Sequence, residues 1–266
     1  MTRFKFLLFI PVLAGFAALA YAGFDEAKEA YEKGDYSTAY KEFKALAEQG
    51  NAQSQFYLGA MCDLGQGVPQ NQTEAMKWYL KAAEQGIDRA ELALGLKYAG
   101  GIGIPQNYAE AVKWYQRAAE HGIPEAQSDL GLMYSQGKGV TQNKAEAMKW
   151  YRKAAEQGYA MAQCNLGLMY AKGNGAPQDY AEAVKWFRRA AEEGYVKAQY
   201  NLGVAYEKGD GVEKDFVLAH MWFNLAAVQG DSDAKKQGDL VARQMTPAQI
   251  AEAQSLARVW KPKGRD

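Results

Sequence analysis

The stretch AEAVKWYQRAAEHG at residues 109–122 decides the fold, because the chain repeats it at a fixed interval. It returns as AEAMKWYRKAAEQG at 145–158 and as AEAVKWFRRAAEEG at 181–194, each time 36 residues further on. A fixed period of roughly 20 to 50 residues is typical of solenoids, in which each unit buries its apolar face only against its neighbours. The sequence therefore predicts an all-α solenoid of repeated helix pairs.

A glycine closes each unit and sets the frame of the repeat. The closing glycines are Gly50, Gly86, Gly122, Gly158, Gly194 and Gly230. Counted from this glycine, a first helix carries leucine at the eighth place and glycine at the ninth in all five units that follow. Tyrosine fills the twelfth place in four units, and Cys62 fills it in the first. These places lie on one side of an α-helix, because its period is 3.6 residues.

A Gly-x-Gly turn follows the first helix in every unit, as in Gly101 and Gly103. We expect these glycines to adopt left-handed or crowded conformations that other residues take only at a cost. The turn resembles a phosphate-binding loop only superficially. No strand is expected before it, and no third glycine or Lys-Ser/Thr pair completes a nucleotide fingerprint.

The second helix of four units begins after an Asn or Asp that is followed three residues later by Glu, as in Asn107 and Glu110. This spacing predicts a capping box, in which the cap oxygen accepts a backbone N–H and the acid reaches back to the N–H of the cap.

The same helix has an apolar side and a charged side. The apolar side of the first unit carries Ala75, Trp78, Tyr79, Ala82 and Ala83. Small residues let helices approach closely, and the aromatic rings fill the remaining volume. The other side places Glu and Lys or Arg three and four residues apart, which predicts a solvated outer face. A ladder that grips an anionic polymer is the functional alternative for that face.

Together these motifs resemble a known repeat. The pattern Leu-Gly-x-x-Tyr, Gly-x-Gly-Val-x-x-Asn/Asp and Glu-Ala-x-x-Trp-x-x-x-Ala-Ala-x-x-Gly is similar to the Sel-one-like repeat (SLR), a relative of the tetratricopeptide repeat with a longer turn. Five copies cover residues 51–230, and residues 23–50 resemble a shorter tetratricopeptide-type hairpin. The resemblance implies a right-handed α-solenoid of antiparallel helix pairs, with capping helices and a short polar tail at 231–266.

Residues 1–22, MTRFKFLLFIPVLAGFAALAYA, have the pattern of a secretory signal peptide. Arg3 and Lys5 give a basic start, an apolar run follows, and Ala20, Tyr21 and Ala22 form a small-x-small cleavage site. This predicts a periplasmic or secreted protein without a stable membrane span after cleavage. An uncleaved anchor is the alternative, although the run of about 15 residues is shorter than the roughly 20 that a spanning helix needs.

The charge balance bears on the kind of partner. The whole chain has 31 basic and 31 acidic residues, and residues 1–22 contain two of the basic ones and none of the acidic ones. The mature chain is therefore nearly neutral, which makes nucleic acid a poor candidate partner.

Few residues suggest chemistry. Cys62 and Cys164 lie three units apart, beyond the reach of a disulfide, and are expected to be buried as small apolar residues. His121 and His220 are expected to be structural, and their spacing predicts neither a metal site nor a cofactor site. Ser-x-x-Lys occurs twice, at Ser135 and again at 232–235, without the partner motifs of a β-lactam-reactive serine. We therefore expect no enzymatic activity.

The superfamily resemblance implies that the first helices line a concave surface. The places most distant from the leucine side are the third, sixth, tenth and thirteenth, and they give a candidate groove made of Phe56, Ala60, Asp63, Leu92, Leu96, Ser128, Leu132, Ser135, Leu168, Tyr200, Val204 and Glu207. Such a groove would bind a protein or peptide to a monomeric scaffold. The alternatives are that these residues pack between units, that the protein binds cell-wall polysaccharide, or that it is a β-lactam-binding or hydrolysing repeat protein.

The last full unit departs from the pattern. Its outer positions carry Leu218, Met221 and Leu225 in place of charged residues. Downstream, Thr246 begins a capping-box sequence with a helical apolar stripe that ends at Trp260. We expect this C-terminal helix to fold back over the three apolar residues as a lid.

Overall fold

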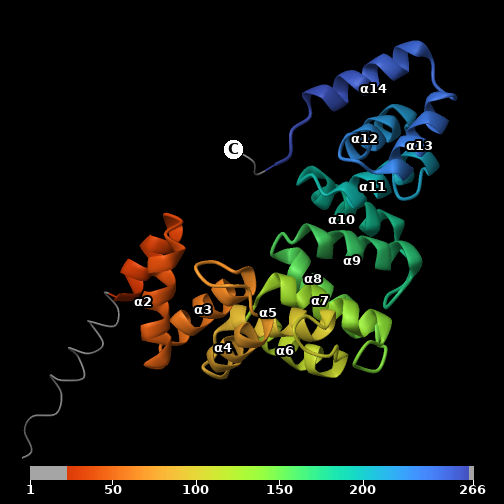
Figure 1. The fold of residues 1–266 in the computed structure, drawn as a ribbon. Helices are drawn as coiled ribbons and strands as arrows, with labels where there is room; N and C mark the ends of the chain where they lie inside the picture. The colour runs from red at the N-terminus through yellow and green to blue at the C-terminus, as the bar shows by residue number, and fades with distance from the viewer. Residues whose placement is uncertain (1–22, 264–266) are drawn as a thin grey trace, which may run out of the picture. The chain divides into compact units, whose positions relative to one another are not determined.

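The computed structural model describes residues 23–263 and shows an all-helical chain in which these residues contain no strand (Figure 1). The predicted signal peptide lies outside the described residues. The chain divides into two compact units, Met1–His121 and Gly122–Asp266. Within 23–263, every helix is too short or too polar to cross a membrane.

The helices follow one another as the repeat predicts. In the first unit, a helical segment at 23–32 precedes α2 (Tyr36–Glu48), α3 (Ala52–Leu64), α4 (Gln72–Glu84), α5 (Asp88–Gly100) and α6 (Tyr108–Glu120). The second unit contains α7 (Pro124–Gln136), α8 (Lys144–Glu156), α9 (Ala160–Lys172), α10 (Tyr180–Glu192), α11 (Val196–Lys208), α12 (Phe216–Val228), α13 (Ser232–Ala242) and α14 (Pro247–Val259).

Each repeat is an antiparallel pair, as α3 and α4 show. The middle of α3 meets the middle of α4, where a Cβ on Gly59 would lie 2.9 Å from the Tyr79 ring. The end of α3 meets the start of α4, because Gln72 Nε2 donates to the Asp63 carbonyl at 3.1 Å. The glycine at the ninth place therefore serves close packing against an aromatic ring. The leucines beside these glycines are at most 1% exposed, namely Leu58, Leu94, Leu130, Leu166 and Leu202. Successive pairs pack on one another within each unit, which confirms the solenoid-like fold.

The second glycine of the Gly-x-Gly turn ties one repeat to the preceding one. Gly103 has φ 78°, and a Cβ there would lie 2.5 Å from Gln72 at the start of α4. Gly211 has φ 75°, and its Cβ would lie 2.3 Å from the backbone carbonyl of Tyr180 at the start of α10. Only glycine fits both the positive φ and the backbone contact, as the sequence predicts.

The second helices are capped as expected, but not by a capping box. Asn107 Oδ1 accepts from the Glu110 N–H at 3.1 Å. The Glu110 carboxylate does not reach back to the cap, because it forms an ion pair with Lys113 at 2.5 Å. The same Glu–Lys pair forms in α4, α8 and α10. The predicted capping box is therefore wrong in these helices, since a lysine one turn away supplies a charged partner for the acid.

Both sides of the second helix contribute to packing. The alanine and aromatic residues of the apolar side are buried as predicted, except that Trp114 and Ala227 are half-buried. The cations of the charged side are exposed, as predicted, and in four of the five repeats one of them also lies over the ring of a tryptophan. These pairs are Lys81 on Trp78, Arg117 on Trp114, Lys153 on Trp150 and Arg189 on Trp186, with cation-to-centroid distances of 4.2, 5.0, 4.0 and 4.6 Å. Cys62 and Cys164 are free and buried, as expected.

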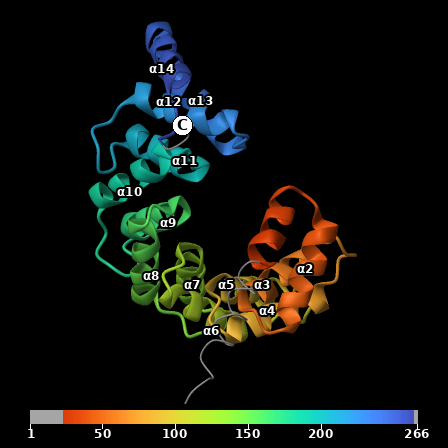
Figure 2. The same ribbon diagram turned by 90° about the vertical axis from the view of Figure 1, so that its left-hand side faces the viewer.

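The C-terminal helix covers the last repeat, and both ribbon views place α14 beside α12 (Figures 1 and 2). Trp222 has Leu225 one turn later in place of a cation, and the Trp260 ring takes that position, with ring centroids 6.0 Å apart. Met221 is buried, and Leu218 and Leu225 are partly buried against the same core. The predicted lid is therefore confirmed.

Candidate interaction surfaces of the first helices

The predicted groove residues of the first unit lie on α3 and α5, and they differ in exposure. Leu96 is 48% exposed, whereas Ala60 and Leu92 are half-buried. Phe56 lines a hollow of about 410 Å³ together with Phe24.

Asp63, another predicted binding residue, is committed to a buried ion pair. Its carboxylate lies 2.8 Å from the Nζ of Lys97, whose side chain is 5% exposed. Lys97 also donates to Gln72 Oε1 at 2.5 Å, and Tyr79 donates its hydroxyl to Asp63 at 3.4 Å. Burial raises the pKa of the Tyr79 hydroxyl, and the Asp63 charge raises it further. Asp63 therefore holds two repeats together and offers little to a ligand.

Sequence reasoning missed Lys97, although a signal for it exists. Lys97 stands at the eleventh place, where the other units carry Met61, Met133, Met169 and Ala205. A single charge among apolar residues at one place of a repeat indicates a buried partner.

Four of the seven predicted residues of the second unit come together, on α7, α9 and α11. Leu132, Ser135 and Leu168 line a hollow of about 350 Å³. Leu132 and Leu168 also line a second hollow of about 410 Å³ with Tyr200. Asn165 contributes to both. The two hollows therefore share a floor and form one surface across three successive first helices.

Polar side chains at the seventh place cross this part of the molecule. They are Asp129, Asn165 and Asn201 on α7, α9 and α11, and sequence reasoning did not single them out. Burial raises the pKa of Asp129 to about 6, and the nearby Glu125 carboxylate adds to the effect. Asn201 Nδ2 donates to Cys164 Sγ at 3.6 Å. The sequence does contain a signal for these residues: the seventh place is polar in the last three repeats, whereas the first two repeats carry Tyr57 and Ala93 at that place.

Three predicted residues of the second unit do not line these hollows. Ser128 is 2% exposed, so its hydroxyl is not available at the surface. Val204 packs against the core of the last repeats. Glu207 accepts two hydrogen bonds from Gln237 Nε2, at 2.8 and 2.9 Å, and is thereby tied to α13.

Buried polar side chains also join neighbouring repeats. Gln199 donates to the Ala191 carbonyl at 3.4 Å and accepts from Gln229 at 2.9 Å, and Gln55 and Gln163 make the same contact to the preceding helix. This contact joins the first turns of a first helix to the end of the preceding second helix. It also fixes how one pair sits on the next.

The corresponding place in the second repeat carries Glu91, which is fully buried. Arg117 lies 2.8 Å and His121 3.2 Å from its two carboxylate oxygens. Burial raises the pKa of Glu91, and its neighbours Arg117 and His121 act against that rise. The carboxylate is enclosed, so a substrate does not reach it in the folded chain.

The remaining candidate chemistry is internal to the helices. Ser135 donates its hydroxyl to the Leu132 carbonyl at 3.0 Å. His220 is buried with its Nδ1 3.0 Å from Asn224 Nδ2, and burial lowers its pKa. Within 23–263, no group of three or more His, Cys, Asp or Glu side chains is arranged to hold a metal ion.

Comparison with known proteins supports the assignment of the repeat. The Sel1 repeat model matches residues 52–87, 88–123, 124–159, 160–195 and 196–231. A comparison with curated proteins found no match. A Sel1 repeat protein from Oxalobacter formigenes is 34% identical, with a TM-score of 0.79 over 92% of this chain and 98% of that one. A protective antigen of uropathogenic Escherichia coli with the SLR fold is 32% identical, with a TM-score of 0.82 over 95% of this chain and 56% of that one. The chain belongs to the Sel1 repeat family.

Proposed function

We propose that this protein is an exported, non-catalytic scaffold that binds a protein or peptide through the first-helix surface of its second unit. Sel1 repeats are typically protein-interaction scaffolds. The observation that carries the proposal is the pair of adjoining hollows along α7, α9 and α11, which share Leu132, Asn165 and Leu168.

The chemistry of this surface suits a peptide. Leu132 and Leu168 offer an apolar floor, and Tyr200 adds an aromatic wall. The amide side chains of Asn165 and Asn201 offer both donors and acceptors, which match the backbone N–H and C=O groups of an extended chain. Apolar contacts and a few convergent polar groups are what a specific site needs.

Polysaccharide binding is less well supported by the same surface. Stacking on sugars needs accessible aromatic faces, but four of the five repeat tryptophans are at most 9% exposed. Their outward faces lie under Lys, Arg or Trp260 side chains. These tryptophans therefore pack in the hydrophobic core and present no open face to a sugar.

The binding test uses residues 23–266 and a variant in which the shared floor is charged, Leu132→Asp with Leu168→Asp. The matched control is Leu64→Asp with Leu240→Asp, since these leucines are 64% and 40% exposed and line neither hollow. All three proteins are checked for equal helicity and then used to capture partners from envelope extract. We expect one protein to bind the parent and the control but not the floor variant. Equal capture by all three would exclude this surface.

Export is tested separately. The N-terminal segment supports cleavage after Ala22. We expect the native protein in the periplasmic or secreted fraction, with Gly23 as its first residue in N-terminal sequencing. A cytoplasmic protein that begins at Met1 would refute export while leaving the binding surface untouched.

A further inference from the structure

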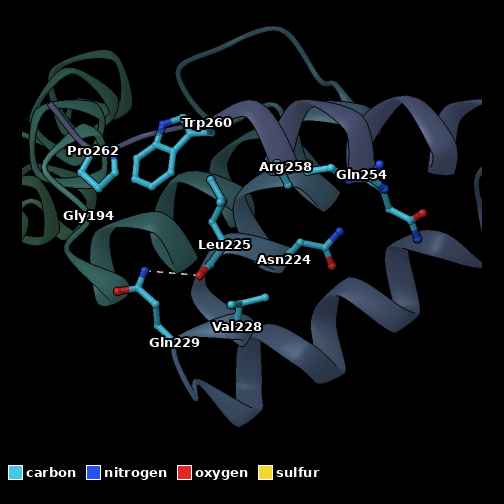
Figure 3. Close-up of a pocket in the computed structure, with 10 residues that line it drawn as sticks. Gly194, Asn224, Leu225, Val228, Gln229, Gln254, Arg258, Trp260 and Pro262 are labelled. Atoms are coloured by element: carbon cyan, nitrogen blue, oxygen red, sulfur yellow. Dashed lines mark hydrogen bonds between the residues drawn. The ribbon is translucent and has the colours of Figure 1, made fainter.

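A further hollow, of about 530 Å³, lies between α12 and the C-terminal segment of the second unit. Leu225 and Val228 on α12 form its floor, and Trp260 and Pro262 form one end (Figure 3). Arg258 and Gln254 on α14 lie toward the other end. Its volume is that of an ordinary ligand pocket.

The sequence builds this floor only in the last repeat. The place of Val228 is occupied by glutamate in the other four repeats, at Glu84, Glu120, Glu156 and Glu192. Val228 is 88% exposed, although α14 packs against α12. Contact with α14 therefore does not explain this valine. Together with Leu225, Trp260 and Pro262 it forms an open apolar lining that an apolar ligand group can contact.

The charge of the hollow points to an anionic ligand. Arg258 is the only charged residue among those that line it. The ion pairs among residues 23–263 do not involve Arg258. A free guanidinium beside an apolar floor matches a carboxylate, which it can bind through two parallel hydrogen bonds.

Amide groups at the same rim distinguish a peptide from a fatty acid. The Gln254 side chain lies next to Arg258, and Asn224 lies beside the floor (Figure 3). The exposed Gln254 amide can bond to the backbone N–H and C=O groups of a peptide, and Asn224 Oδ1 can accept a backbone N–H while Asn224 Nδ2 stays on His220. A hydrocarbon tail offers neither group a hydrogen bond.

We propose that this hollow binds the C-terminal end of a peptide. An apolar side chain rests on Leu225 and Val228 against Trp260, and the terminal carboxylate pairs with Arg258. The site is separate from the first-helix surface, so this proposal can be tested independently of the proposed scaffold function.

The test uses synthetic hexapeptides that begin Gly-Ser-Gly-Ser and end in every pair drawn from Val, Leu, Ile and Phe. Each is made with a free C-terminal carboxylate and with a carboxamide, and dodecanoate serves as the lipid probe. Binding to residues 23–266 is measured by isothermal titration calorimetry. We expect at least one free-carboxylate peptide to bind, and its amide to bind at least about tenfold more weakly, since hydrogen bonds to charged groups are the strong ones.

Two variants locate the site. Arg258→Gln removes the guanidinium, and Val228→Glu restores the residue of the other repeats; each should weaken binding at least about tenfold. The matched controls are Arg243→Gln and Val259→Glu, because both residues are exposed and lie outside the hollow. Both controls should bind as the parent does. Absence of binding by every peptide, equal binding of the amides, binding unchanged by either variant, or binding of dodecanoate alone would each overturn the proposal.

Discussion

Among single residues, Glu91 tests how much a buried charge costs this fold. A carboxyl whose pKa is raised by burial holds its proton more tightly when folded, so its contribution to stability falls as pH rises above about 4. Glu91→Gln introduces the amide that four other repeats carry. We expect this variant to match the parent near pH 4 and to be more stable by roughly 1 kcal/mol at pH 7. Urea unfolding at the two pH values measures the difference.

The opposite substitution, Gln199→Glu, tests whether a carboxylate can be buried at this place without the partners of Glu91. Gln199 is fully buried like Glu91, but Leu225 and Gln229 stand where Arg117 and His121 stand in the second repeat. Gln199→Glu therefore buries a carboxylate without a cation, at a cost of roughly 3 to 5 kcal/mol at pH 7. A Gln199→Glu protein as stable as the parent would show that Arg117 and His121 are not what permits a buried Glu91.

Among the elements, α12 and α14 depend on each other. In the other repeats a cation covers the outward face of tryptophan, whereas in the last repeat Trp260 covers Trp222. Trp260→Ala should lower stability by about 2 kcal/mol, less than for a fully buried tryptophan because this ring is only half-buried. That corresponds to a fall of roughly 4 to 8 °C in Tm, measured by circular dichroism.

The control for this prediction is the neighbouring residue. Val259 is 72% exposed at the end of the same helix, so Val259→Ala should leave Tm within about 2 °C of the parent. If Trp260→Ala also left Tm unchanged, the contact of α14 with the last repeat would not stabilise it, and α14 would not act as its cap.

At the scale of the whole molecule, the repeat made most of the fold predictable. The period and frame of the repeat predicted the helix pairs and the left-handed glycines, and the departure of the last unit from that pattern predicted the lid. The period could not predict the ion pairs between repeats or which candidate site residues are exposed, because both depend on contacts between repeats. Lys97 and Asp63 meet across neighbouring pairs, and Ser128 is buried while Leu132 lines a hollow, although both were placed on the same helix face. Which part of a face is open depends on how the next pair is rotated, and a helical period does not contain that information.

The repeat contacts also predict how far a perturbation spreads. In a solenoid each repeat touches only its neighbours, so stability is roughly a sum of local terms. Gly103→Ala and Gly211→Ala force a Cβ into the start of the preceding second helix, at positive φ, in the first and second units respectively. Each should cost more than about 1 kcal/mol.

Amide hydrogen exchange shows where that cost appears, because local opening exposes the amides of the weakened segment first. We expect Gly103→Ala to speed exchange mainly in α3 to α6, and Gly211→Ala mainly in α9 to α14. A matched control is Gly86→Ala, whose positive φ is similar but whose Cβ meets no atom within 4 Å. It reports backbone strain without the inter-repeat contact and should disturb the neighbouring pair less. If Gly103→Ala instead speeded exchange equally from α2 to α14, the chain would unfold as a single cooperative block, and nearest-neighbour coupling would not describe it.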